Sequence, residues 1–237
     1  RAYTFASNGD YGNGRVQQDI VEGVRWLLAQ GIGDKDRVGI VGHSFGGYST
    51  LLGLTFQPEL FKVGVAGSPP ADLGWSMRWL VDAGEQGDLP DRSLKHTLAA
   101  LSLDPADPAT YARLHTQSPM IHAARMQRPL LILAGGADRT VAIREVINYT
   151  ATLKTAKRPV TLLVEPNGGH SPVDPVPREA YLYGMEAMLQ KHLGGELQEP
   201  PGQRLRAYLR ENLRLAGPEF RAFAGKSAAP VPVEVTQ

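Results

Sequence analysis

The chain has 237 residues, of which 42% are hydrophobic and 21% charged, so it can bury a sizeable core and is not disordered as a whole. Its 25 Lys and Arg against 24 Asp and Glu leave a net charge of +1, which argues against nucleic acids and anionic membranes as partners. The absence of cysteine excludes disulfides, thiolate metal sites and a cysteine nucleophile. No apolar run reaches the roughly 18 residues of a membrane-spanning helix.

Helical and strand patterns alternate along most of the chain. Apolar residues at helical spacing predict helices over residues 16–30, 48–57, 142–154 and 178–193. Short apolar runs without polar alternation predict strands over residues 37–41, 61–66, 129–134 and 160–164. Because parallel strands need covering crossovers, this order predicts an α/β fold with a mostly parallel sheet and helices on both faces.

Two regions stand outside this alternation. Residues 71–128 form a longer excursion between the second and third strands, with helical stretches near residues 94–101 and 109–115, and we expect it to be a cap or pocket wall. After Gly195 the sequence becomes rich in Pro and Arg, with one amphipathic stretch over residues 205–215. We therefore expect residues 1–194 to form one α/β domain and residues 195–237 to form a peripheral tail.

The pentapeptide Gly42-His43-Ser44-Phe45-Gly46 matches the G-x-S-x-G pattern of a nucleophile elbow in the α/β-hydrolase fold. It lies between a predicted strand and a predicted helix, as such an elbow requires. The turn strains the serine backbone, so the positions two before and two after the serine need small residues to avoid clashes. Gly42 and Gly46 meet this need. We predict that Ser44 is a nucleophile and that the backbone N–H of Phe45, at the positive end of the next helix, stabilises an oxyanion.

A nucleophilic serine needs a base and an acid, and this fold supplies the acid first and the base second, each on a loop after a strand. Asp138 follows the strand predicted at residues 129–134, and His170 follows the strand predicted at residues 160–164. We assign His170 as the general base and Asp138 as the carboxylate that orients it. Rivals of Asp138 that follow no clear strand are Asp104, Asp107 and Asp174.

The remaining histidines and the basic tail residues are interpreted first as structural, while two tryptophans stay open. His43 is most simply a packing residue. No carboxylate partner stands at metal-ligand spacing from the other histidines, so no metal site is expected; these are His96, His115, His122 and His192. Trp75 and Trp79 have helical spacing and could line a pocket over the serine or belong to the core. A solvated amphipathic helix is favoured over an anion-binding face for the basic tail residues Arg204, Arg206, Arg210 and Arg214.

At this point several segments together resemble one family. Gly42-His43-Ser44-Phe45-Gly46-Gly47-Tyr48 resembles the serine motif of the prolyl oligopeptidase family of serine peptidases. Residues 9–12, 18–20 and 23–27 resemble the stretch that leads into the nucleophile strand of that family. Residues 118–120 and 129–131, with Asp138 and Val141, resemble its run into the acid loop. The resemblance covers roughly residues 9–193.

The resemblance implies an α/β-hydrolase catalytic domain that hydrolyses peptide bonds of short peptides through an acyl-enzyme. The family's serine, aspartate and histidine roles fall on Ser44, Asp138 and His170, and no cofactor is implied. In the dipeptidyl-peptidase branch an Asn two places after the acid holds a substrate carbonyl, whereas this chain departs from that pattern with Thr140. Nothing in this chain can form the N-terminal propeller that family members usually carry.

The upstream part of the fold is also short. By analogy with the fold, about four of the usual eight or so strands are present, and the strand at residues 38–41 is left with an unpaired apolar edge. We expect this chain to be part of a longer polypeptide, or an upstream segment or another chain to cover that edge. The chain starts at Arg1 without Met or a signal-like segment, so a cytoplasmic and an exported location both stay open.

Two alternatives to a peptidase stay open. The first alternative is a carboxylesterase or acyl hydrolase, because the same triad hydrolyses esters. The second alternative is a non-catalytic binding module of the same fold. Candidates for the substrate pocket follow strand ends or flank the triad; they are Pro70, Trp75, Phe45 and Val141.

Overall fold

The computed structural model describes residues 9–85, 98–99, 101–196 and 199–224. Its helices are α1 (Arg15–Ala29), α2 (Phe45–Phe56), α3 (Leu73–Glu85), α5 (Pro108–Gln117), α6 (Ile143–Thr155), α7 (Pro175–Leu193) and α8 (Gln203–Asn212). Its strands are β1 (Gly39–His43), β2 (Val63–Gly67), β3 (Leu130–Gly135), β4 (Val160–Glu165) and β5 (Leu213–Leu215). Two short 3₁₀ helices cover Ala123–Arg125 and Pro218–Phe223. In the described residues, no helix is both long and apolar enough to cross a bilayer.

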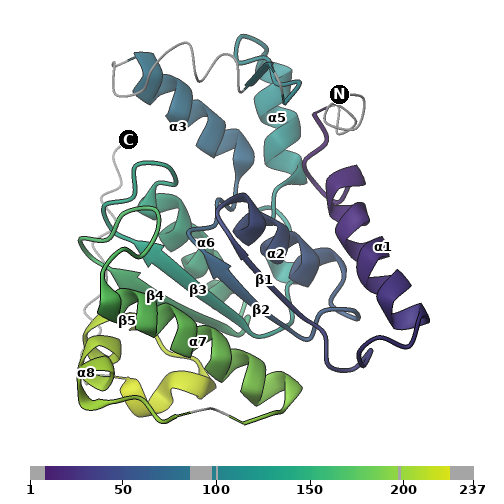
Figure 1. Ribbon diagram of the computed structural model, residues 1–237. Helices are drawn as coiled ribbons and strands as arrows, with labels where there is room; N and C mark the ends of the chain where they lie inside the picture. The colour runs from purple at the N-terminus through teal and green to yellow at the C-terminus, as the bar shows by residue number, and fades with distance from the viewer. Residues whose placement is uncertain (1–8, 86–97, 100, 197–198, 225–237) are drawn as a thin grey trace.

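The strands form one sheet in the order β1-β2-β3-β4-β5 (Figure 1). The first four strands run parallel, and β5 pairs antiparallel with β4. Strands β2 and β3 are buried along their whole length, as their unbroken apolar sequences predicted. The predicted α/β fold with a mostly parallel sheet is therefore confirmed.

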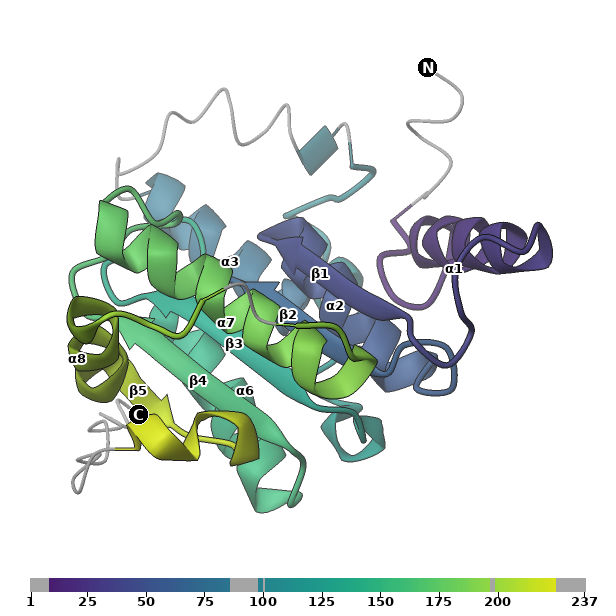
Figure 2. The ribbon, with the colours of Figure 1, turned by 60° about the horizontal axis from the view of Figure 1, so that its bottom comes forward.

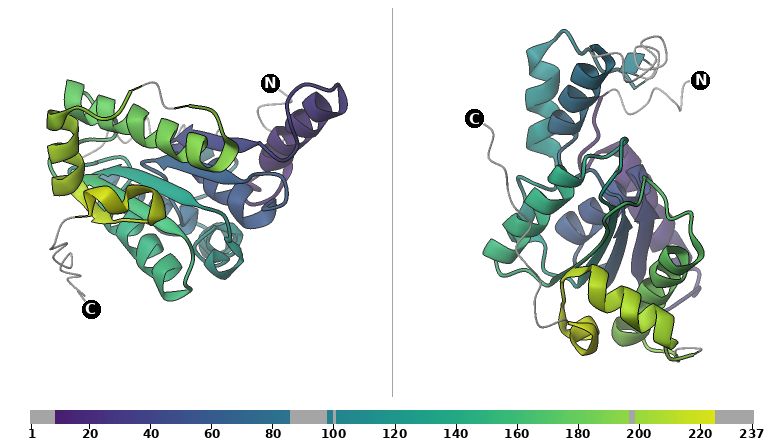
Figure 3. Two further views of the ribbon diagram at one scale, coloured as in Figure 1. Left: turned by 90° about the horizontal axis from the view of Figure 1, so that it is seen from below. Right: turned by 90° about the vertical axis from the view of Figure 1, so that its left-hand side faces the viewer.

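Helices cover both faces of this sheet (Figures 2 and 3). One hydrophobic core joins the sheet to α1, α2 and α6, and the other joins it to α7, α8 and the last 3₁₀ helix. Leu51 and Leu54 of α2 are fully buried against the sheet. Complete burial of a leucine side chain stabilises a fold by ~1.5–3 kcal/mol. These contacts therefore fix α2 on the sheet, directly after Ser44 in the chain.

Helices α3 and α5 extend beyond the sheet at the carboxyl ends of its parallel strands (Figure 1). Helix α3 follows β2 after five residues, and its apolar residues Leu73, Met77 and Val81 form a small core with α5. Helix α5 begins with Pro108, and the Asp107 side chain accepts a hydrogen bond from the first turn. The helix predicted near residues 94–101 lies largely outside the described residues.

The end of the described chain differs from the sequence expectation. The described residues after Gly195 are not peripheral: Leu205 and Leu209 of α8 are buried in the core, and β5 extends the sheet beyond β4. Residues 213–215 continue the apolar spacing of α8, so they were predicted to be helical. The free edge of β4 offers hydrogen-bonding groups that local sequence patterns do not reveal, and pairing with it makes these residues a strand.

Candidate active site

Ser44 lies on the sharp turn between β1 and α2. Its backbone has φ 57° and ψ −122°, a conformation that residues with a side chain rarely adopt. The Ser44 N–H donates a hydrogen bond of 2.8 Å to Gly67 O at the end of the neighbouring strand β2. This bond and the firmly packed α2 hold the strained turn in place, which leaves the Ser44 side chain half-buried at the carboxyl edge of the sheet.

The two glycines of the elbow have different roles. A Cβ on Gly42 would lie 2.1 Å from Gly46 O, so only glycine fits at position 42. The expectation that Gly46 must be small for the same reason is wrong, because a Cβ there would meet nothing within 4 Å in the described part of the chain. The turn is tight because the two backbones approach each other, and a side chain at position 42 alone would point into the gap.

His170 joins Ser44 to Asp138 through its two ring nitrogens. Nε2 lies 2.9 Å from Ser44 Oγ, and Nδ1 lies 2.8 Å from Asp138 Oδ2. The other carboxylate oxygen, Oδ1, accepts hydrogen bonds from the backbone N–H groups of Thr140 at 2.7 Å and Val141 at 3.0 Å. The Asp138 carboxylate is therefore fixed on both sides, and it in turn fixes the orientation of the imidazole.

The loops that carry Asp138 and His170 are bonded to each other. Ala137 N donates to Gly168 O at 2.9 Å, and a Cβ on Gly135 would lie 2.1 Å from Gly169 O. The Ser68 hydroxyl, on the loop after β2, donates to the carbonyl oxygen of His170 at 2.9 Å. The loops of Asp138 and His170 are thus held together by direct contacts, and Ser68 connects the His170 loop to the end of β2.

His43 packs behind the imidazole of His170. The two ring centroids are 4.9 Å apart, and His43 Nε2 lies 3.2 Å from the Ser171 hydroxyl. Burial lowers the pKa of His43, and the neighbouring His170 lowers it further. Both effects favour the uncharged form of His43, which lies beside His170.

The predicted pocket residues do not all lie together. Phe45 is the first residue of α2, and its exposed ring makes an edge-to-face contact with Tyr11, with centroids 6.2 Å apart. Val141 is buried in the acid loop. Pro70 is buried three residues after β2. Trp75 stacks on Trp79 at 6.3 Å and lines a separate pocket between α3 and α5.

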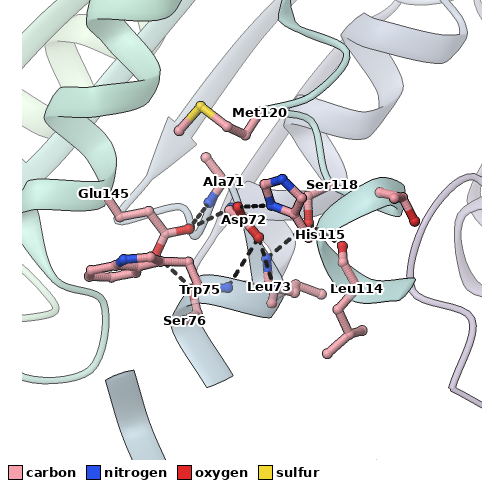
Figure 4. A network of polar contacts seen from close by, with 12 residues as sticks. Ala71, Asp72, Leu73, Trp75, Ser76, Leu114, His115, Ser118, Met120 and Glu145 are labelled. Atoms are coloured by element: carbon pink, nitrogen blue, oxygen red, sulfur yellow. Dashed lines mark hydrogen bonds and ion pairs between the residues drawn. The ribbon is translucent and has the colours of Figure 1, made fainter. Parts of the chain in front are cut away.

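Sequence reasoning missed a second polar network, which lies at the base of α3 (Figure 4). Glu145 Oε1 accepts hydrogen bonds from the N–H groups of Ala71 and Asp72 at 2.6 and 2.5 Å, and Oε2 accepts one from the Ser76 hydroxyl at 2.6 Å. Burial raises the pKa of Glu145 to about 7. Asp72 in turn contacts His115. Asp72 stands on the loop after β2 much as Asp138 stands after β3, and this position could have drawn attention to it.

The rivals of Asp138 have local structural roles. Asp104 accepts a hydrogen bond from Ala106 N, Asp107 caps α5, and Asp174 immediately precedes α7. Among the described residues, no three His, Asp or Glu side chains gather as a group that could hold a metal ion.

A serine on a strained strand-to-helix turn, bonded through a histidine to a carboxylate at the carboxyl edge of a parallel sheet, defines the α/β-hydrolase class. Within that class, a model of the prolyl oligopeptidase family matches residues 1–196, and the chain belongs to this family. The resemblance seen in the sequence is thereby confirmed.

The relatives include two proteins at 32% identity. Dipeptidyl aminopeptidase BIII of Pseudoxanthomonas mexicana matches over 201 residues, covering 85% of this chain and 28% of that protein. Dipeptidyl peptidase family member 6 of Caenorhabditis elegans matches over 206 residues, covering 84% and 26%. This chain therefore spans little more than a quarter of the length of these relatives.

Solved structures share the fold at lower sequence identity. A puromycin-hydrolyzing peptidase of Mycobacterium tuberculosis superposes with a TM-score of 0.65 at 23% identity, covering 77% of this chain and 26% of that one. The acylaminoacyl peptidase of Pyrococcus horikoshii gives a TM-score of 0.61 at 22% identity, covering 78% and 28%. These neighbours agree with the sheet and helix arrangement described above.

Proposed function

We propose that this chain carries the catalytic site of a serine peptidase that hydrolyses short peptides through an acyl-enzyme on Ser44. The observation that supports this most strongly is the pair of contacts made by His170, at 2.9 Å to Ser44 Oγ and 2.8 Å to Asp138 Oδ2. A nucleophile and base within hydrogen-bond reach, with the base oriented by a third group, is the arrangement that acyl transfer requires.

Each group has a defined part in the reaction. Ser44 Oγ attacks the substrate carbonyl carbon while His170 Nε2 takes its proton, and Asp138 stabilises the imidazolium that forms. The Phe45 N–H donates to the developing oxyanion. His170 then gives its proton to the leaving amine as the C–N bond breaks. A water molecule, deprotonated by His170, releases the acyl group from Ser44 and restores the free hydroxyl.

The substrate class follows from the relatives. The relatives at 32% identity are named as dipeptidyl peptidases, and others at 26–28% are named acylamino-acid-releasing enzymes. Both names support a short peptide as substrate. Thr140, which stands two residues after Asp138, uses its backbone N–H to bond that carboxylate.

Comparing turnover of dipeptidyl, acylaminoacyl and simple ester substrates separates the two peptidase types from a carboxylesterase.

Labelling with a fluorophosphonate tests the catalytic assignment. The probe is expected to label the protein covalently, and the label should disappear in Ser44→Ala while remaining in Ser49→Ala, a buried serine of α2 that serves as control. Labelling of Ser44→Ala at the original level would refute the assignment. Absence of labelling in a full-length protein that folds would favour a non-catalytic binding module.

We also propose that an upstream segment or another chain pairs with β1. In the described sheet β1 pairs only with β2, and the Val41 side chain on it is 41% exposed. Large apolar residues on and beside α1 are exposed as well, namely Trp26, Leu27 and Ile32. Hydrogen exchange of the full-length protein tests this: slow exchange at the β1 amides is expected, and exchange as fast as in an open loop would contradict it.

A further inference from the structure

Asp72 and His115 form a carboxylate–imidazole pair built in the same way as Asp138 and His170. Asp72 Oδ2 lies 2.5 Å from His115 Nδ1. Its Oδ1 accepts hydrogen bonds of 3.0 and 3.1 Å from the N–H groups two and three residues further along the chain. The Asp138 carboxylate bonds the N–H groups two and three residues after it with one oxygen and a histidine with the other. The fold therefore holds two histidines by the same device.

In the second pair, the buried Asp72 carboxylate orients the exposed His115 ring. The Asp72 side chain is 8% exposed, whereas the His115 side chain is 51% exposed. Beneath them Glu145 bonds the Asp72 N–H and the Ser76 hydroxyl, and the Ser118 hydroxyl bridges Leu73 N and the carbonyl of the turn before it (Figure 4). A ring whose direction is fixed by successive buried hydrogen bonds is the arrangement found where a side chain must meet a ligand at a set position.

This ring faces a pocket between α3 and α5. The pocket has a volume of about 320 Å³, within the range of small-molecule sites. Trp75, Pro108, Tyr111 and Ala112 supply apolar and aromatic walls. Arg78 also lines it, with its guanidinium carbon 5.0 Å from the centroid of the Tyr111 ring.

The groups left for a ligand are cationic or hydrogen-bonding. Asp72 is already engaged by two backbone N–H groups and by His115. Within the described chain, neither the Arg78 guanidinium nor His115 Nε2 has a hydrogen-bond or ion-pair partner. Arg78 is permanently charged, and its planar fork of N–H groups matches a carboxylate. The His115 ring can form a further hydrogen bond through Nε2.

We propose that the α3–α5 pocket binds the carboxyl terminus of a short peptide whose last side chain is apolar. The carboxylate lies against Arg78 and His115, and the side chain lies against the Trp75 and Tyr111 walls. None of Ser44, Asp138 and His170 lines this pocket, and binding there is measured without turnover, so the proposal can be tested even if the proposed peptidase activity fails.

Calorimetry on the full chain with Ser44→Ala, which cannot cleave, tests the proposal. The probe is an N-acetylated tripeptide ending in phenylalanine, compared with the same peptide carrying a C-terminal amide. The free acid is expected to bind at least about tenfold more tightly, because a charge-assisted pair with Arg78 is lost in the amide. Adding Arg78→Gln should abolish that difference, and adding His115→Gln should reduce it.

The matched control is Arg125→Gln. Arg125 also stands over an aromatic ring, with its guanidinium carbon 4.7 Å from the Phe56 centroid, but it does not line the pocket. This variant should leave both affinities unchanged. Equal affinity of the acid and the amide would overturn the proposal, and so would equal effects of Arg78→Gln and Arg125→Gln. Displacement of the peptide by inorganic phosphate at a concentration below that of the peptide would overturn it as well. If Arg78→Gln does not fold, the acid–amide comparison and His115→Gln decide the matter.

Discussion

Glu145→Gln is expected to stabilise the protein at alkaline pH, although it removes a charge from a fully formed hydrogen-bond network. The Glu145 side chain is almost completely buried, and burial raises its pKa from 4.5 to about 7. The folded state therefore prefers the neutral form. Between about pH 4.5 and 7 the unfolded chain has released a proton that the folded chain still holds, so stability falls as the pH rises through this interval.

The size of the effect follows from the shift. A difference of about 2.5 pKa units, at ~1.4 kcal/mol per unit, corresponds to ~3 kcal/mol lost in the wild type above pH 7. Glutamine has almost the same shape and no charge. Its carbonyl can still accept from Ala71 N and Asp72 N, and the Ser76 hydroxyl can turn to accept from its amide group. The variant avoids the cost of the charge and keeps the contacts.

Thermal unfolding at pH 4.5 and pH 8.5 measures this difference. At pH 4.5 the two proteins should differ little, and at pH 8.5 the Tm of Glu145→Gln should be higher by roughly 6–12 °C, given ~2–4 °C per kcal/mol for a chain of this size. Glu22→Gln, an exposed change on α1, is the control and should show no such pH-dependent gain. An advantage that does not grow between the two pH values, or a Tm below the wild type at pH 8.5, would refute the reasoning.

Three further changes test the active site. Gly42→Ala should prevent correct folding, because its Cβ would lie 2.1 Å from Gly46 O, whereas Gly46→Ala should fold normally; equal yields and melting curves would contradict this. Asp138→Asn should lower kcat by about 10⁴ with little loss of Tm, as expected when the base is held in the wrong tautomer, and a loss below tenfold in single-turnover assays would argue against the triad. Trp75 lines the α3–α5 pocket, which none of the triad residues lines, so Trp75→Ala should leave kcat/KM unchanged, and a raised KM or lowered kcat/KM would place Trp75 beside the substrate after all.

Local patterns predicted the centre of the fold well. Strands β2, β3 and β4 are buried on both faces, so their apolar runs leave a clear signal. The site was predictable for a related reason. Parallel strands end at one edge, so a Ser, an Asp and a His placed directly after three of them are brought to the same rim, although 126 residues separate Ser44 from His170.

Features that depend on distant partners could not be predicted in this way. Strand β5 exists because the edge of β4 accepts it, and nothing in residues 213–215 alone indicates that. His115 was judged to have no carboxylate partner because Asp72 is 43 residues away, and only the packing of α3 against α5 brings them together. The elbow pattern marks Gly46 as a position for a small residue, but the pattern does not contain the direction of the Cβ, which here meets nothing within 4 Å in the described residues.

The three side chains of the proposed triad follow strands that differ in their number of neighbours. Asp138 and His170 follow β3 and β4, which have a neighbour on either side, while Ser44 follows β1, the outermost strand of the described sheet. Fraying at that margin would displace the hydroxyl and leave the acid–base pair assembled. An element that docks alongside β1 would thus affect the position of Ser44 Oγ before that of His170 or Asp138. The rate of acylation should therefore depend on how tightly such an element pairs with β1.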